Sequence, residues 1–222
     1  MSAEPPPRSV FSSASPALLA AVARAASPVR VEAGAALFGQ GDAADCFYIV
    51  DHGEIEISVM SPGGRKLTLE IMTPGEVFGE IGLFAGRRTA GAAALGPALL
   101  RRVRRSDLLA IIRRDPELAL EFIEILCARL RTNSEHLQQR AFLPLPTRLA
   151  ARLLALAVKV GAPDGAVRVS QAELADFAGA TREAVAKTLA LWKREGWISL
   201  SRGELRILDR GALGALAESA EE

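Results

Sequence analysis

The stretch with the clearest capacity for chemistry runs from residue 78 to residue 90 and reads FGEIGLFAGRRTA. Gly79 lets the backbone approach a ligand closely, and a short helix beginning after it would direct free N–H groups at an anion. The Glu80 carboxylate can accept from a hydroxyl group, and Arg88 and Thr89 can donate to phosphate oxygens. The stretch can therefore hold a ribose and a phosphate together; the simpler alternative is a glycine-rich turn beside a solvated pair of arginines.

A second group of polar residues follows the pattern of two short helices joined by a turn. Ser170 and Glu173 have the spacing of a capping box, which predicts a helix to about Phe177. A tight turn at residues 178–180 precedes Thr181, which caps a second helix that extends to about Glu195. Residues 196–200 and 204–208 then predict a hairpin, so the segment has the order of a winged helix-turn-helix.

The second of these helices carries side chains that suit the edges of bases. Arg182, Glu183 and Lys187 can project together from its first turns. Arginine or lysine suits the acceptors of guanine, and glutamate can accept from the amino group of cytosine. A surface ion pair between Glu183 and Lys187 is the alternative. Three further residues lie at the starts of the two helices and are therefore candidates for phosphate contacts: Ser170, Gln171 and Thr181.

These two groups lie on either side of a long helix predicted from Asp115 to Phe142. Pro116 suits the first turn of a helix, and two prolines at 144 and 146 end it. Its apolar seam alternates spacings of three and four, which favours pairing with another helix, and consists of Ile123, Leu126, Leu130, Asn133 and Leu137. Asn133 can set the register of such a pair, contact a ligand, or do both.

Short β-type runs fill residues 29–103 and follow a short predicted helix over residues 16–26. Residues 47–50 and 55–59 flank a four-residue connection, which predicts a hairpin. Residues 61–64 form a strong turn pattern before an alternating strand over residues 66–72. Strands at this spacing, without a long helix between them, predict a closed or rolled antiparallel sheet.

Charge and composition limit the classes of protein that fit. The net charge is +1, but residues 144–210 hold eleven basic and seven acidic residues, a balance compatible with DNA binding. Two cysteines and two histidines lie far apart along the chain, without the spacing of metal, haem or iron–sulfur ligands. No apolar run approaches the ~18 residues of a membrane span, so we expect a cytoplasmic protein without a membrane partner.

Residues 78–90 resemble the phosphate-binding cassette of cyclic-nucleotide-binding domains in their order of glycine, glutamate, aliphatic, small residue and leucine, then arginine, hydroxyl residue and alanine. The second helix of the helix-turn-helix resembles the recognition helix of the CRP/FNR transcription factors, which opens with a hydroxyl residue, arginine and glutamate. Only residues 84–87 separate Leu83 from Arg88, where many members have a longer spacer, so Arg87 and Arg88 both stay candidates for the phosphate contact.

The resemblance covers residues 29–208 and implies an α+β chain with an N-terminal antiparallel β-roll of the cyclic-nucleotide-binding type, a long dimerisation helix and a C-terminal winged helix-turn-helix. The implied parts are a disordered tail (1–14), the β-roll domain (15–114), the dimerisation helix (115–142) and the DNA-binding domain (143–222). The implied ligand contacts are Gly79, Glu80, Ile81, Arg88, Thr89, Asn133 and Ser134.

The implied function is that of a dimeric transcription regulator, not an enzyme, and without a prosthetic group. Its expected effector is a cyclic nucleotide, cyclic AMP first and cyclic GMP second. Its expected partners are a near-palindromic double-stranded DNA operator, a second copy of the chain and RNA polymerase. The alternatives are a related regulator that binds DNA without cyclic nucleotide or senses another effector, a kinase-type regulatory subunit, and a metal-dependent β-barrel enzyme.

Overall fold

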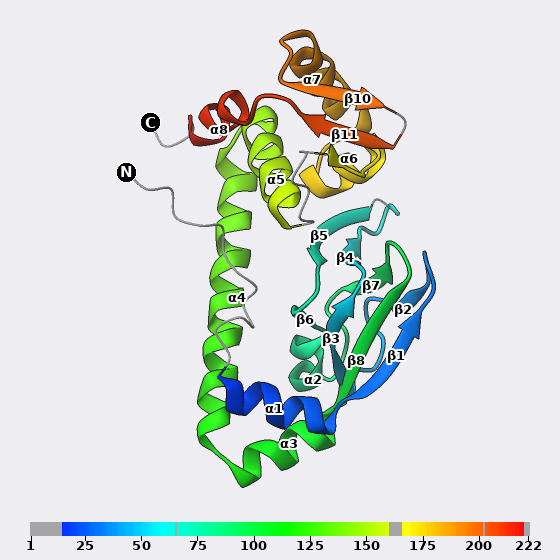
Figure 1. Ribbon diagram of the computed structural model, residues 1–222, viewed down its shortest axis with the longest axis vertical. Coiled ribbons are helices and arrows are strands. Elements are labelled where there is room, and N and C mark those ends of the chain that lie inside the picture. The colour runs from blue at the N-terminus through cyan, green and yellow to red at the C-terminus, as the bar shows by residue number, and fades with distance from the viewer. Residues whose placement is uncertain (1–14, 65, 160–165, 202, 220–222) are drawn as a thin grey trace. The chain divides into compact units, whose positions relative to one another are not determined.

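The computed structural model describes residues 15–64, 66–159, 166–201 and 203–219 (Figure 1). The chain forms two compact units: the first extends to Asn133 except for residues 66–68, and the second combines those three residues with residues 134–222. The domain boundaries expected at residues 114 and 142 stay predictions. The predicted tail over residues 1–14 lies outside the described residues, and so do residues 161–165, where the glycines and the proline predict a loop.

The first unit contains two four-stranded sheets whose paired strands run antiparallel. One sheet has the order β1 (Ser27–Val31), β8 (Ala98–Arg104), β3 (Cys46–His52) and β6 (Val77–Phe78). The other has the order β2 (Ala36–Phe38), β7 (Gly91–Ala94), β4 (Ile55–Met60) and β5 (Lys66–Met72). The predicted antiparallel β-type fold is confirmed, including the strand over residues 66–72.

The predicted hairpin between residues 47–50 and 55–59 is wrong. Both strands exist, but β3 pairs with β8 and β6, whereas β4 lies in the other sheet. The chain changes sheets at Gly53, whose φ is +83° and where a Cβ atom would lie 2.6 Å from the carbonyl oxygen of Pro97. Glycine is required there because the backbone is left-handed and closely packed. Alternating apolar residues predicted the strands correctly, but they do not encode which strand each one pairs with.

Helices close one end of the β-roll and share its core. α1 (Pro16–Ala25) begins at Ser15, whose hydroxyl accepts from the amide of Leu18, and α3 (Arg105–Arg114) follows β8 directly. Side chains from these helices, from the first sheet and from the start of α4 (Glu117–Phe142) form one buried cluster, which includes Leu18, Phe47, Val103, Leu108 and Phe122. α4 therefore starts as part of the core of the first unit.

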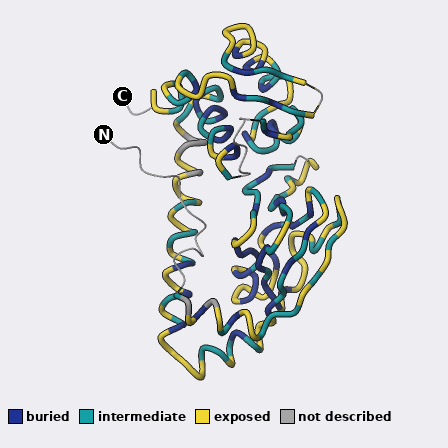
Figure 2. Tube along the Cα trace, viewed as in Figure 1, coloured by how far each residue is buried: buried dark blue, intermediate teal, exposed yellow. Residues whose placement is uncertain are grey.

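Two different faces of α4 carry its apolar residues. Leu118, Phe122 and Ile125 are buried, and Leu126 packs against the same cluster. A second row has the three-and-four spacing and is exposed along the first unit: Leu120, Ile123, Cys127 and Leu130. Figure 2 shows buried and exposed residues alternating along this helix. The predicted seam is thus wrong at Leu126, which packs against the core, and the neighbouring Cys127 lies in the exposed row instead. This exposed row is hereafter called the α4 seam.

The second unit begins its own helices after a short break at residues 143 and 144. α5 (Leu145–Lys159) contains Pro146 in its first turn, where proline removes no helical hydrogen bond. α6 (Gln171–Ala178), α7 (Arg182–Arg194) and a three-stranded sheet of β9 (Ala166–Val167), β11 (Glu204–Ile207) and β10 (Ile198–Ser201) follow. The helix-turn-helix and its hairpin are confirmed; α8 (Arg210–Glu218) was not predicted.

Candidate functional site

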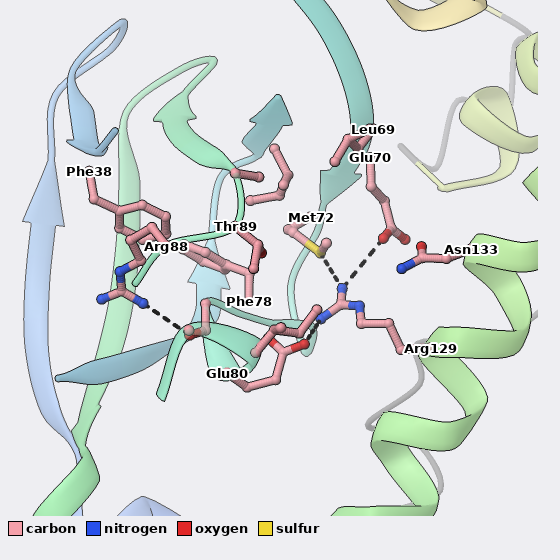
Figure 3. A pocket seen from close by; sticks show the side chains of 15 residues that line it. Phe38, Leu69, Glu70, Met72, Phe78, Glu80, Arg88, Thr89, Arg129 and Asn133 are labelled. Carbon is pink, nitrogen blue, oxygen red and sulfur yellow. Dashed lines mark hydrogen bonds and ion pairs between the residues drawn. The ribbon is translucent and has the colours of Figure 1, made fainter. Parts of the chain in front are cut away.

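A cavity of about 300 Å³ lies in the first unit, at the place where residues 78–90 meet α4. Most of the ligand contacts expected from the sequence line it: Gly79, Glu80, Ile81, Arg88, Thr89 and Asn133. Ser134 is exposed and does not line it. Figure 3 labels four of the expected contacts that line the cavity, together with residues of β2 and β5 that the sequence did not single out. A cavity of this size is at the lower end of the range for small-molecule sites.

Glu80 lies at the centre of the cavity and is held by a residue of the long helix. Its side chain is 2% exposed, and the carboxylate accepts from Nη1 of Arg129 at 2.6 Å. Arg129 also donates to the carbonyl oxygen of Val77 at 2.8 Å and reaches Glu70 at 3.4 Å through Nη2. Burial by itself lowers the pKa of Arg129, but the facing carboxylates of Glu80 and Glu70 outweigh it, so that the pKa lies above its ordinary value.

Arg88 is turned into the wall of the cavity rather than toward Glu80. Nη1 donates to the carbonyl oxygens of Cys46 (2.7 Å) and Gly79 (3.0 Å), and Nη2 lies 3.3 Å from the thiol sulfur of Cys46. The guanidinium carbon lies 4.0 Å from the centre of the Phe38 ring. The Nε atom is buried and has no hydrogen-bond partner among the described residues. A buried donor without a partner is uncommon and fits an acceptor supplied by a ligand.

The backbone conformation of residue 79 favours glycine, and the terminal nitrogen of Arg88 lies close by. Gly79 adopts a φ of +82°, and a Cβ atom at this position would lie 2.6 Å from Nη1 of Arg88. The neighbouring Arg87 has a different environment: it is exposed, does not line the cavity and donates to the carbonyl oxygen of Gly41 at 2.8 Å. Of the two arginines, only Arg88 therefore belongs to the cavity wall in this conformation.

Two charged residues of the cavity were missed by the sequence analysis. The sequence pattern places Arg129 among the charged flanks of the long helix, although it lies four residues before Asn133 and so shares its face. Glu70 belongs to an alternating strand, in which a charged residue is ordinarily a solvent-facing one. Arg129 lies 49 residues from Glu80 and 59 residues from Glu70 along the chain, so no local pattern could connect it with these carboxylates.

The helix-turn-helix is built by the caps that the sequence predicted. The Ser170 hydroxyl accepts from the amide of Glu173, and the Glu173 carboxylate accepts from the amide of Ser170, which completes the capping box. Gly179 ends α6 in the left-handed conformation, and the Thr181 hydroxyl accepts from the amide of Ala184 to begin α7. Each hydroxyl keeps its own O–H group as a donor for an acceptor outside the helix.

α7 separates a buried face from a polar one. Val185, Thr188, Leu189 and Trp192 are buried. The predicted base-contact residues lie at its exposed start: Arg182, Glu183 and Lys187. Glu183 and Lys187 form no ion pair with each other in the part of the chain that the structure describes, so both side chains stay available to another molecule. Gln171, at the start of α6, is partly exposed.

Two further observations bear on other classes of protein. Within the described ranges, no three His, Cys, Asp or Glu side chains are arranged to hold a metal ion. None of the helices in those ranges combines the length and the apolar character that crossing a membrane requires.

Comparisons with known proteins agree with both halves of the structure. Residues 28–115 match the family model of the cyclic nucleotide-binding domain, and residues 147–216 match that of the Crp-like helix-turn-helix domain. A CRP-like cAMP-activated global transcriptional regulator of Mycobacterium tuberculosis is 33% identical over 214 residues, covering 94% of this chain and 96% of that protein. The cyclic AMP receptor protein of Thermus thermophilus is 33% identical and covers 83% of this chain and 85% of its own length.

A solved structure of a CRP/FNR-family transcriptional regulator from Thermus thermophilus has a TM-score of 0.75 and 28% identity, covering 87% of this chain and 100% of that one. The cavity-bearing β-roll and the helix-turn-helix therefore define a class: cyclic-nucleotide-binding transcription regulators. Within that class the chain belongs to the CRP/FNR family, whose members are regulators and not enzymes.

Proposed function

We propose that this chain is a dimeric transcription regulator whose affinity for DNA is switched by a cyclic nucleotide bound in the β-roll cavity. The observation that carries the proposal is the Arg129–Glu80 ion pair, because it joins a residue of the cavity to α4, the helix that extends into the second unit. A ligand that engages Glu80 must act on this contact. It changes DNA affinity only if it prefers one of the two states of the protein.

The cavity offers complementary groups for the sugar and the phosphate. A ribose hydroxyl can donate to Glu80, whose two carboxylate oxygens allow it to keep Arg129 as a partner. The unpartnered Nε of Arg88, the Thr89 hydroxyl and the backbone around Gly79 are the donors proposed for the cyclic phosphate. Asn133 is proposed to contact the purine. Ser134 lies outside the cavity of its own chain and is proposed to contact the nucleotide bound in the cavity of the second chain.

The α4 seam supports a dimer of two parallel helices. Leu120, Ile123 and Leu130 are 56%, 53% and 66% exposed. Large apolar side chains at heptad spacing on one helix face are those that a second helix covers. A two-fold dimer presents two α7 helices, so the operator is proposed to be near-palindromic with half-sites ~34–36 Å apart. Contact with RNA polymerase stays a prediction.

Cyclic nucleotide is expected to strengthen binding to a palindromic duplex, selected from random sequence, by at least about tenfold. Fluorescence anisotropy of the labelled duplex, with and without nucleotide, measures this. Arg182→Ala should then weaken operator binding by about 1–3 kcal/mol and relax the preference at one base pair. Arg194→Ala, at the opposite end of α7, is the matched control and should change affinity little. DNA binding that is identical with and without either cyclic nucleotide would favour the alternative regulator that needs no nucleotide.

Mild oxidation is expected to join two chains through Cys127 in nearly quantitative yield. The thiol is exposed in the middle of the α4 seam, and facing core positions of a parallel helix pair lie at distances compatible with a disulfide. Non-reducing electrophoresis measures the cross-link, which Cys127→Ser should abolish. Cys46 is buried, so Cys46→Ser is the matched control and should leave the cross-link intact. A monomeric mass by light scattering, together with no cross-link, would contradict the dimer.

A further inference from the structure

The cavity has an acidic and amide-bearing side that the proposed sugar and phosphate contacts do not use. Glu70, from β5, and Asn133, from α4, both line it. Figure 3 shows these two side chains close together on one side of the cavity, with Arg88 on the other side and Glu80 between them. Glu70 and Asn133 are 63 positions apart in the sequence, but both side chains lie on the same side of the cavity.

The guanidinium of Arg129 contacts both carboxylates, and it does so unequally. Arg129 binds Glu80 at 2.6 Å through Nη1 but lies 3.4 Å from Glu70 through Nη2. The latter distance is at the upper limit of a hydrogen bond. A carboxylate has about four lone-pair directions, so Glu70 has capacity to accept from a ligand in the cavity in addition to the partners that it already has. Its side chain is 28% exposed, which leaves that capacity accessible.

Charge determines which part of a nucleotide can lie beside Glu70. A cyclic phosphate is an anion, and it would be repelled by this carboxylate while being attracted to Arg88. With the ribose at Glu80, as proposed above, the phosphate would lie toward Arg88 and Thr89, and the base would lie toward Glu70 and Asn133. The base is therefore the part of the ligand that these two residues contact.

The two purines differ on the edge that would meet a carboxylate and an amide. Guanine presents two adjacent donors, N1–H and the N2 amino group, beside the acceptor O6; adenine presents the acceptor N1 beside its N6 amino group. A carboxylate can accept from both guanine donors at once, as it does from the fork of an arginine, whereas it would face the lone pair of adenine N1. The Asn133 amide can donate to O6 and completes the match.

We propose that Glu70 and Asn133 select guanine, so that cyclic GMP binds this chain more tightly than cyclic AMP. The inference rests on the proposed function, since it names the nucleotide for the same cavity. It also departs from the order in which the two nucleotides were expected from the sequence, where Glu70 had no assigned role. The selectivity resides in the donor pattern of the base, not in the ribose or the phosphate, which the two nucleotides share.

The test is calorimetric titration of the full chain, stripped of nucleotide, with cyclic GMP, cyclic AMP and cyclic inosine monophosphate. We expect cyclic GMP to bind at least about tenfold more tightly than cyclic AMP. Cyclic inosine monophosphate keeps N1–H and O6 but lacks the N2 amino group, so its affinity should fall between the other two. Glu70→Gln should weaken cyclic GMP binding at least about fivefold while changing cyclic AMP binding less than about threefold.

Glu32→Gln is the matched control, because it removes the same charge from an exposed position of the β-roll that does not line the cavity. In this variant, the ratio of the affinity for cyclic GMP to the affinity for cyclic AMP should equal that of the unaltered chain. Should Glu70→Gln fail to fold, Asn133→Ala takes its place and should lower the cyclic GMP preference through the loss of the O6 donor. Circular dichroism separates misfolding from altered binding.

The outcomes separate the inference from the function on which it rests. Cyclic AMP binding as tightly as cyclic GMP, or more tightly, overturns the guanine assignment and leaves the nucleotide-gated regulator intact. A cyclic GMP preference that survives unchanged in Glu70→Gln overturns the role of Glu70. Failure of all three nucleotides to bind the unaltered chain overturns the proposed function, and the inference with it.

Discussion

Arg88→Ala is expected to lower the affinity for cyclic nucleotide by about a hundredfold or more. Removing one member of a buried, charged hydrogen-bonded pair ordinarily costs about 2–5 kcal/mol, and ~2.7 kcal/mol corresponds to a hundredfold. The guanidinium is 5% exposed and stacks over Phe38, so a phosphate bound to it would be well shielded from water. Calorimetric titration of the purified chain gives the change in Kd directly.

Arg87→Ala is the matched control for this loss. It removes the same charge one residue away, but Arg87 is exposed and bonds only the carbonyl oxygen of Gly41 among the hydrogen bonds described. We expect its effect on Kd to stay within about threefold. Arg88→Lys keeps the positive charge but loses the planar guanidinium that can donate two parallel hydrogen bonds, so its Kd should lie between those of the two alanine variants. Comparable losses for Arg87→Ala and Arg88→Ala would show that general charge, and not the cavity wall, attracts the phosphate.

Arg129→Met is expected to destabilise the β-roll by about 3–5 kcal/mol. It leaves the carboxylate of Glu80, whose side chain is 2% exposed, without its cationic partner in a desolvated place. Breaking a buried ion pair by removing one member is costly because the other charge stays buried. The methionine preserves much of the stem volume of the arginine, so lost packing contributes little. Urea denaturation followed by circular dichroism measures the free energy of unfolding.

The double variant Arg129→Met with Glu80→Gln separates the charge effect from other causes. Removing both charges should restore much of the stability lost in Arg129→Met, since no uncompensated carboxylate stays at the centre of the cavity. Arg131→Met, an exposed neighbour on α4, serves as the control and should cost less than about 0.5 kcal/mol. If Arg129→Met alone lowers the free energy of unfolding by less than about 1 kcal/mol, then water or another cation reaches the Glu80 carboxylate in that variant.

The same ion pair connects stability to ligand response. A nucleotide hydroxyl that donates to Glu80 would either weaken or strengthen the hydrogen bond between Arg129 and Glu80. Arg129 belongs to α4, whose seam is proposed to join two chains. Glu70 is the weaker partner of the same guanidinium, so a base that engages Glu70 acts on the helix as well. In the proposed complex, recognition of the base and of the sugar would therefore both act on α4 through Arg129, which would connect the choice of nucleotide to the proposed dimer helix.

Local features of the chain were predictable because their causes are local. The capping hydroxyls of Ser170 and Thr181 bond amides three residues away, so the two helices of the helix-turn-helix could be placed from the sequence. Strand β5 over residues 66–72 and the turn at residues 61–64 follow from alternation and from turn residues. The order of cassette, long helix and helix-turn-helix was sufficient to indicate the family that the comparisons confirm.

The sequence alone thus determined most of the elements, their order and the candidate stretch over residues 78–90 that lines the cavity, because backbone hydrogen bonding and side-chain periodicity act over a few residues. Only the tertiary structure decided that β3 and β4 belong to different sheets, that Leu126 faces the core while Cys127 lies in the α4 seam, and that Arg129 and Glu70 enter the cavity. These outcomes depend on contacts between residues dozens of positions apart. The packing that brings such residues together, and not any pattern within a short window, sets which charges face the cavity.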